Sequence, residues 1–146
     1  MKRDTHAVFA LAVLSYMLNK PLTPEEVMGW ILLTMAGALF PDLDYWLRKY
    51  PLIVHRKTLH NLWSLLLSSA LVYRFLGEGW IPWIVGYVTH LALDSMTKVG
   101  IDFLLIGKRI RGPFKTGGLV DRAILVLSAL TLIYKAFGDV LMGVIT

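Results

Sequence analysis

The sequence predicts an all-α fold, an integral membrane bundle of about five short transmembrane helices. Hydrophobic residues make up 56% of the chain, above the roughly 45–50% of ordinary soluble domains, so several helices are expected to face lipid. Five apolar segments are separated by charged or Pro/Gly-containing stretches, and Lys and Arg gather in alternate connections. No linker or repeat divides the chain, so residues 1–146 are expected to form a single membrane-embedded domain.

Helix start and stop residues delimit the first two segments. The first helix is expected over residues 7–18 and stops at residues 19–21, Asn-Lys-Pro. The second is expected to begin after Thr23, which is placed to cap it, with Pro24 in its first turn. It runs to Phe40, where proline follows.

The remaining three segments are bounded by helix start and stop residues of the same kind. The third is expected over residues 62–76, the fourth over 80–96, and the fifth from Asp121 to Tyr134 or beyond. Most are shorter than the ~20 residues that cross a full hydrocarbon core. Two interpretations follow: the helices cross a thinned bilayer, or some are half-embedded in the bundle.

The distribution of basic residues predicts the topology of a multi-pass protein of the inner or plasma membrane. If all five segments cross and the N-terminus is cytoplasmic, the external side holds only Lys20, Arg74 and Lys135. The cytoplasmic side then holds Lys2, Arg3, Arg48, Lys49, Arg56, Lys57, Lys98, Lys108, Arg109, Arg111, Lys115 and Arg122. This asymmetry is the one that the positive-inside rule expects.

This topology places every histidine and several aspartates at the cytoplasmic face. They are His6, Asp42, Asp44, His55, His60, His90 and Asp94. His90 and Asp94 form the strongest pair, because residues four apart share one face of a helix. Ionisable groups inside a membrane helix are costly and usually functional. The alternative is a His–Asp hydrogen bond that only ties helices together.

Two loops supply the other candidates. Pro41 is expected to end its helix, so that Asp42 and Asp44 leave in an extended or turn geometry suited to one cation. The alternative is a solvated helix end, and the choice of ligand and general base between the two carboxylates stays open. His55 and His60 are five apart and cannot share a helical face. We therefore expect His60 at the start of the third helix as the better ligand, with His55 beside substrate.

Several other chemistries are disfavoured. The chain has no cysteine, which excludes thiolate ligands and a cysteine nucleophile. No Gly-x-Ser-x-Gly elbow or phosphate-binding glycine loop is present. The net charge is +5, but the basic residues flank apolar runs, so no nucleic-acid partner is expected.

The sequence resembles the YdjM-like family, described as LexA-regulated or inner-membrane metal-dependent hydrolases. The matching features are Thr5-His6, Pro41-Asp42-Leu43-Asp44, His55-Arg56, His60, Gly86-Tyr87, His90, Asp94, Thr97 and Gly100. It is more distantly similar to zinc-dependent phospholipase C and the P1-type nucleases. This likeness implies a core metal site of Asp42 or Asp44 with His60, His90 and Asp94. It also implies a second ion at His6 and Asp121, an acid that follows a Thr-Gly turn.

These observations predict a metal-dependent hydrolase that acts at the cytoplasmic face. A metal-activated water would attack a phosphoester or lipid-like anionic substrate. Imidazole and carboxylate ligands favour Zn²⁺, with Mn²⁺ or Fe²⁺ as alternatives. Asp42, His55 and Arg56 are the catalytic candidates, because Arg suits phosphate or carboxylate. Membrane lipids and a small-molecule or lipid substrate are the expected partners. The alternative is a non-catalytic metal-binding or structural membrane protein.

Overall fold

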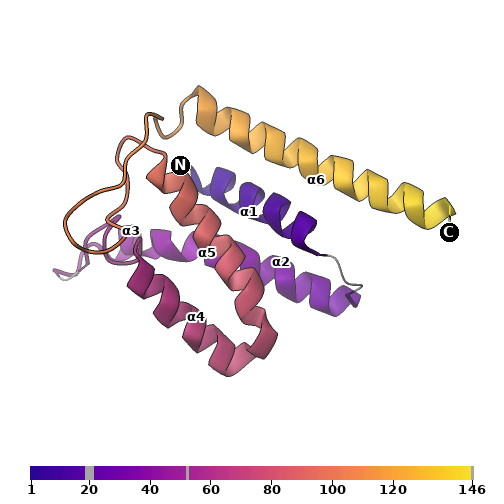
Figure 1. The fold of residues 1–146 in the computed structure, drawn as a ribbon, viewed down its shortest axis with the longest axis horizontal. Coiled ribbons are helices and arrows are strands. Elements are labelled where there is room, and N and C mark those ends of the chain that lie inside the picture. Colours follow the sequence, from indigo (N-terminus) through magenta and orange to yellow (C-terminus); the bar gives the residue numbers. More distant parts are fainter. Residues whose placement is uncertain (19–21, 52, 146) are drawn as a thin grey trace.

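The computed structural model describes residues 1–18, 22–51 and 53–145, the last seven of them as backbone helix. The elements in chain order are α1 (Arg3–Met17), α2 (Pro24–Leu39), η1 (Phe40–Asp42), α3 (Leu43–Leu47), α4 (Leu62–Leu76), η2 (Gly77–Gly79), α5 (Trp80–Ser95) and α6 (Leu119–Ile145) (Figure 1). The all-helical prediction is confirmed. Across the described ranges only two isolated bridges have β geometry, Thr97–Phe114 and Ile101–Ile110.

The five predicted segments correspond to α1, α2, α4, α5 and α6. The start of α2 is fixed as expected, since the Thr23 side chain accepts from the backbone N–H of Glu26 at 3.2 Å. The Glu26 carboxylate returns to the Thr23 N–H at 2.8 Å, which completes a capping box. The predicted stop at residues 19–21 lies outside the described residues. The description of all five helices as short is wrong for α6, which has 27 residues.

The predicted end of the second helix at Phe40 is confirmed to within one residue, since α2 ends at Leu39, but the extended geometry expected after Pro41 is wrong. The chain tightens into the 3₁₀ turn η1 and continues as α3. Proline is tolerated there because it stands at the start of a new helical turn, where its missing N–H is not needed. Asp42 and Asp44 therefore leave a helical backbone rather than an extended one.

The predicted position of His60 at the helix start is corrected by two residues. Asn61 is the N-cap of α4, and its side-chain oxygen accepts from the Ser64 N–H at 2.9 Å. Its amide donates to the carbonyls of Lys57 and Thr58, both at 2.7 Å. His60 thus lies in a loop that these hydrogen bonds shape.

The packing of α2 against α5 forms the centre of the bundle. This is the most extensively packed helix pair, and α6 packs mainly along α1 (Figure 1). A Cβ on Gly37 would meet the backbone carbonyl of Trp83, and one on Gly86 would meet that of Thr34. The two glycines therefore let the backbones of α2 and α5 approach closely.

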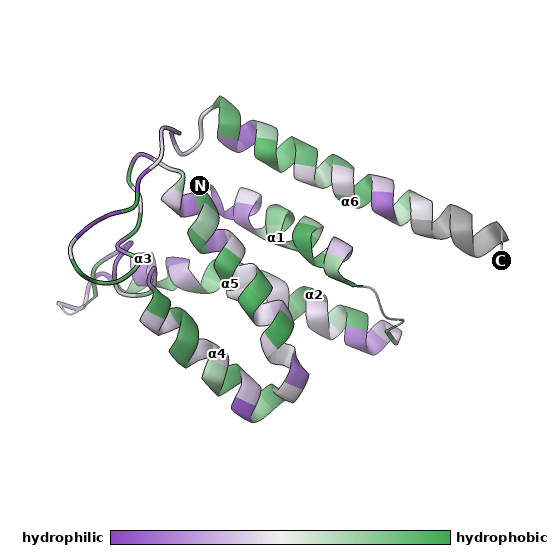
Figure 2. Ribbon diagram, in the orientation of Figure 1, coloured by the Kyte–Doolittle hydropathy of each residue, from purple (hydrophilic) through white to green (hydrophobic). Residues whose placement is uncertain are grey.

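The interior is unusually polar. The fully buried side chains include His6, Thr34, Asp44, His60, Asn61, His90, Asp94 and Thr97. Large apolar side chains instead lie on the outside, such as Leu67 and Phe75 of α4 at 66% and 76% exposure. Hydrophobic residues occur along α1, α2, α4, α5 and α6 (Figure 2). Within the described chain, one helical stretch, Pro24–Leu47, is long and apolar enough to cross a membrane.

Candidate metal centre

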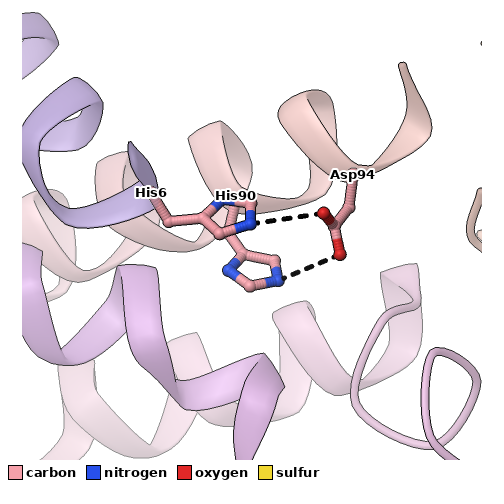
Figure 3. A group of neighbouring side chains, drawn as sticks. All are labelled: His6, His90 and Asp94. Carbon is pink, nitrogen blue, oxygen red and sulfur yellow. Dashed lines mark ion pairs between the residues drawn. The ribbon is translucent and has the colours of Figure 1, made fainter. Parts of the chain in front are cut away.

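Helices α1 and α5 bring three predicted ligands together (Figure 3). His90 and Asp94 lie one turn apart on α5, and His6 reaches them from α1. The rings of His6 and His90 stack with centroids 3.8 Å apart. His6 Nε2 lies 3.2 Å from Asp94 Oδ1. Neither ring nitrogen of His6 has a hydrogen-bond partner among the described residues, so this buried side chain is available to a cation.

His60 and His90 each have one ring nitrogen fixed by a hydrogen bond. Nδ1 of His90 lies 2.6 Å from the Ala38 carbonyl oxygen, which only accepts, so Nδ1 is assigned as the donor. Nδ1 of His60 donates to Asp44 Oδ2 at 3.0 Å. In the neutral rings Nε2 then carries the lone pair, and the two Nε2 atoms lie 3.1 Å apart. Two facing lone pairs repel unless a proton or a metal cation lies between them.

A carboxylate oxygen completes this arrangement. Asp94 Oδ2 lies 3.5 Å from His60 Nε2 and 3.6 Å from His90 Nε2. Tetrahedral zinc with bonds of about 2.0–2.1 Å separates neighbouring ligand atoms by about 3.3 Å. Asp42 Oδ1 stands 3.9 and 4.0 Å from the same nitrogens. The donor set therefore fits Zn²⁺, with three close ligand atoms and a second carboxylate, that of Asp42, beside them.

Asp44 lies behind the imidazoles and is completely buried. Its carboxylate accepts from Nδ1 of His55 at 2.5 Å, from Nδ1 of His60 at 3.0 Å and from the Arg56 N–H at 3.0 Å. These atoms are close enough together to hold an ion. However, the carboxylate oxygens already accept hydrogen bonds from the two imidazoles. A carboxylate in this position orients a ligand histidine and makes its Nε2 a better donor to metal.

Replacing Asp44 by asparagine tests this orienting position. Asn presents an N–H₂ group to one of the two Nδ1 donors, so the His60 ring loses its preferred tautomer or turns. We expect metal affinity to fall by about 10–100-fold while binding persists, as measured by Zn²⁺ titration of purified protein. Complete loss of metal would make Asp44 itself a ligand, as first predicted, and unchanged affinity would remove it from the site.

The protonation of His60 is coupled to metal binding. Burial lowers the pKa of its imidazole, but the hydrogen bond to Asp44 and the nearby carboxylate of Asp94 more than offset burial, so the pKa lies above its ordinary value of 6.5. Protonated His60 is thus favoured below the raised pKa. A metal must displace that proton, and its affinity is expected to rise with pH.

Arg56 faces the same carboxylate from the loop before α4. Its Nη1 lies 3.0 Å from Asp94 Oδ2 and donates to Thr97 Oγ1 at 3.1 Å. Its backbone has a φ of +60°, a strained conformation for a residue with a side chain. The loop therefore holds this guanidinium against the cluster at an energetic cost. The Met1 amino group also forms an ion pair with Asp94.

A pocket of about 450 Å³ opens beside the cluster. It is lined by Met1, Lys2, Arg3, Asp4, Asp42, Tyr45, His55 and Arg56. Three of these side chains are permanently cationic, which suits an anionic ligand. A slightly larger groove between α1 and α6, about 490 Å³, is lined by no histidine or carboxylate. The 450 Å³ pocket beside Asp42 and His55 is therefore the candidate binding pocket.

Asp121 lies apart from the histidines. Its carboxylate accepts from the backbone N–H of Gly117 at 2.6 Å and of Lys2 at 3.2 Å. It thus ties the start of α6 to the start of α1. It joins no His/Asp group within the described residues, and the structure does not bring it to His6.

A model of the YdjM inner membrane protein family matches residues 1–142. The chain belongs to the YdjM family. The family's description gives a membrane location and no reaction. No curated protein and no solved structure matches this YdjM family member.

Two contributors to the site were not identified from the sequence. The Ala38 carbonyl fixes the His90 tautomer, and a backbone oxygen gives no sequence signal. Thr97 holds Arg56 and donates from its hydroxyl to the Asp94 carbonyl at 2.8 Å. The match of Thr97 to the YdjM-like family is the only feature of the sequence that indicates a role for this residue.

Proposed function

We propose that the chain is a membrane-embedded, metal-dependent hydrolase that acts on an anionic phosphoester or lipid-like substrate at the cytoplasmic face. The observation that carries the proposal is the triangle of His60 Nε2, His90 Nε2 and Asp94 Oδ2, with sides of 3.1, 3.5 and 3.6 Å. Both imidazoles are fixed from behind, so these atoms are organised before an ion binds. Zn²⁺ held by three such ligands would lower the pKa of a bound water to about 7.

The chain's own residues have distinct roles in this proposal. His60, His90 and Asp94 hold the metal, and Asp44 orients His60. Asp42 has the right place for a general base, because its carboxylate is 14% exposed at the pocket and close to both Nε2 atoms. His6, whose Nε2 lies 3.2 Å from Asp94 Oδ1 without a hydrogen bond among the described residues, is placed to bind a second ion that shares that carboxylate.

An anionic substrate is supported by the charge around the pocket. Lys2, Arg3 and Arg56 line it together with the Asp42 carboxylate. Arg56 pairs with Asp94, and its fork of donors can also bind phosphate oxygens. His55 is 32% exposed at the same pocket and can contact substrate there.

Metal removal tests the proposal directly. Purified protein is expected to contain a divalent metal and to cleave a generic phosphodiester. Activity should vanish with chelator and return with Zn²⁺ or Mn²⁺, because no other group in the pocket ionises water near neutral pH. Full activity in a metal-free preparation would contradict the mechanism. Bound metal without turnover of phosphodiesters, phosphomonoesters or carboxylesters would instead support the non-catalytic alternative.

We also propose that the helices cross the membrane several times, with the N-terminus inside. The polar interior and the exposed apolar side chains of α4 and α6 support lipid-facing helices. The helices α1, α4 and α5 have 15 or 16 residues, about 23 Å at 1.5 Å per residue. That length requires a locally thinned bilayer.

Single cysteines test this topology in a chain that has none. Lys49→Cys and Arg111→Cys are expected to resist an impermeant thiol reagent added to intact cells and to react after lysis. Glu78→Cys, between α4 and α5, should react from outside and serves as the matched control. External labelling at position 49 or 111 would refute the orientation.

A further inference from the structure

The connection between α5 and α6 contains a shaped hairpin over residues 101–110. Ile101 and Ile110 exchange backbone hydrogen bonds of 3.1 and 2.9 Å, and Asp102 Oδ2 accepts from the Gly107 N–H at 3.1 Å. Ile101 is 1% exposed and packs with Leu65 and other residues of the apolar core cluster. The Ile101–Ile110 end of the hairpin is therefore fixed to the bundle, and this limits the directions in which the tip can project.

The tip of this hairpin is apolar and exposed. Leu104, Leu105 and Ile106 are 46%, 41% and 65% exposed. Leu105 has a φ of +61°, which is unfavourable for a leucine. Three consecutive large apolar residues on an ordered loop indicate a surface made to contact something apolar.

Basic residues border the tip. Lys108, Arg109 and Arg111 follow it and are all exposed. Asp102, the acidic residue of the hairpin, is buried at 3% exposure, and its Oδ2 accepts from the Gly107 N–H. An apolar tip with a cationic border is complementary to an anionic lipid surface, where head groups pair with the cations and the apolar side chains enter between them.

The hairpin lies at the end of the bundle that holds the metal centre (Figure 1). Thr97, shortly before the hairpin in sequence, accepts a hydrogen bond from Arg56. At the same end α3 exposes Trp46 at 63%, beneath the Arg3 guanidinium 5.1 Å from the ring centroid. Arg48 lies 4.3 Å from the ring centroid of Tyr45. Aromatic and basic side chains of this kind occur at membrane interfaces.

We propose that the hairpin 101–110 is an interfacial anchor that inserts Leu104, Leu105 and Ile106 among anionic lipid head groups beside the His/Asp site. A protein partner would need a matching acidic and apolar patch, whereas the YdjM family is a family of inner membrane proteins and has a lipid surface alongside. The anchor would concentrate anionic lipid near the pocket of Lys2, Arg3 and Arg56. The anchor proposal rests on the proposed membrane embedding and does not require the proposed hydrolysis.

The test places an environment-sensitive fluorophore on the tip of the full chain. Ile106→Cys and, as the matched control, Thr116→Cys in the same exposed loop are labelled and reconstituted in nanodiscs. The discs contain phosphatidylcholine alone or mixed with phosphatidylglycerol. We expect the label at 106 to shift to the blue in the anionic discs and to be several-fold less quenched by aqueous iodide than the label at 116. Equal quenching at the two positions would overturn the proposal.

Charge removal separates lipid contact from protein contact. Adding Lys108→Gln, Arg109→Gln and Arg111→Gln to the labelled chain should weaken its preference for anionic discs by about fivefold per charge. Protection at 106 that is unchanged in this variant would overturn the anionic-lipid assignment. Protection in neutral detergent that grows with protein concentration would assign the tip to a contact between copies. Neither readout needs metal or turnover, so their failure is distinguishable from failure of the hydrolase proposal.

Discussion

Replacing Asp94 by asparagine is expected to abolish stable binding of divalent metal. One oxygen of Asp94 faces His60 and His90, and the other faces His6, so this carboxylate contacts every imidazole at the centre of the cluster. Asparagine keeps the volume but removes the charge that offsets the ion. The loss of affinity should exceed the about 10–100-fold that follows from changing a residue behind the ligands. His90→Ala should have a similar effect. Metal content and Zn²⁺ titration of the purified variants measure it.

The control for this experiment is Asp102→Asn. Asp102 is also a buried carboxylate, at 3% exposure, but it accepts from the Gly107 backbone and belongs to no His/Asp group within the described residues. We expect it to retain wild-type metal content. Helical content and monodispersity in detergent verify that the Asp94 variant remains folded. A folded Asp94→Asn protein with wild-type metal content would exclude Asp94 as a ligand.

The limits of the helices were predictable where helix-start and helix-stop residues lie next to them in the sequence. The limits of α4 were expected at residues 62–76 and are observed there, because Gly77 ends the helix and polar residues precede it. The capping box at Thr23 needs only residues near in sequence. The error at Pro41 has the opposite origin. Proline ends one helix and is equally suited to the first turn of the next. The second outcome is accompanied by hydrogen bonds from the buried Asp44 carboxylate to His55, Arg56 and His60, which lie far along the chain.

The site was predictable in composition but not in roles. The four-residue spacing of His90 and Asp94 predicts a shared face, and the structure places both on α5. The roles of Asp42 and Asp44 depend on the continued helix, which turns side chains two residues apart by about 200°. One carboxylate then reaches the pocket and the other lies behind His55 and His60. No spacing rule provides that distinction.

The convergence of the ligands depends on how closely α2 approaches α5, which sequence patterns do not specify. The Ala38 carbonyl of α2 accepts from His90 of α5, so any separation of these helices also releases the imidazole. Gly86 stands one turn before His90, at a point where the two backbones approach closely. An added Cβ there would lie 2.6 Å from the Ala38 nitrogen and would collide with the Thr34 carbonyl oxygen.

Gly86→Ala is therefore expected to destabilise the bundle and to weaken metal binding together. Overpacking against side chains costs about 1–3 kcal/mol, and this collision is with backbone, which yields less, so we expect a loss at or above the upper value. Metal affinity should fall by about 10–100-fold as His90 loses its fixed tautomer. Gly29→Ala is the matched control, because Gly29 lies in α2 with nothing within 4 Å of an added Cβ. There alanine should be neutral or stabilising by up to about 1 kcal/mol. Thermal unfolding in detergent and Zn²⁺ titration of both variants decide the matter. A Gly86→Ala protein that matches Gly29→Ala in both measurements would show that the close contact of α2 and α5 does not hold the site.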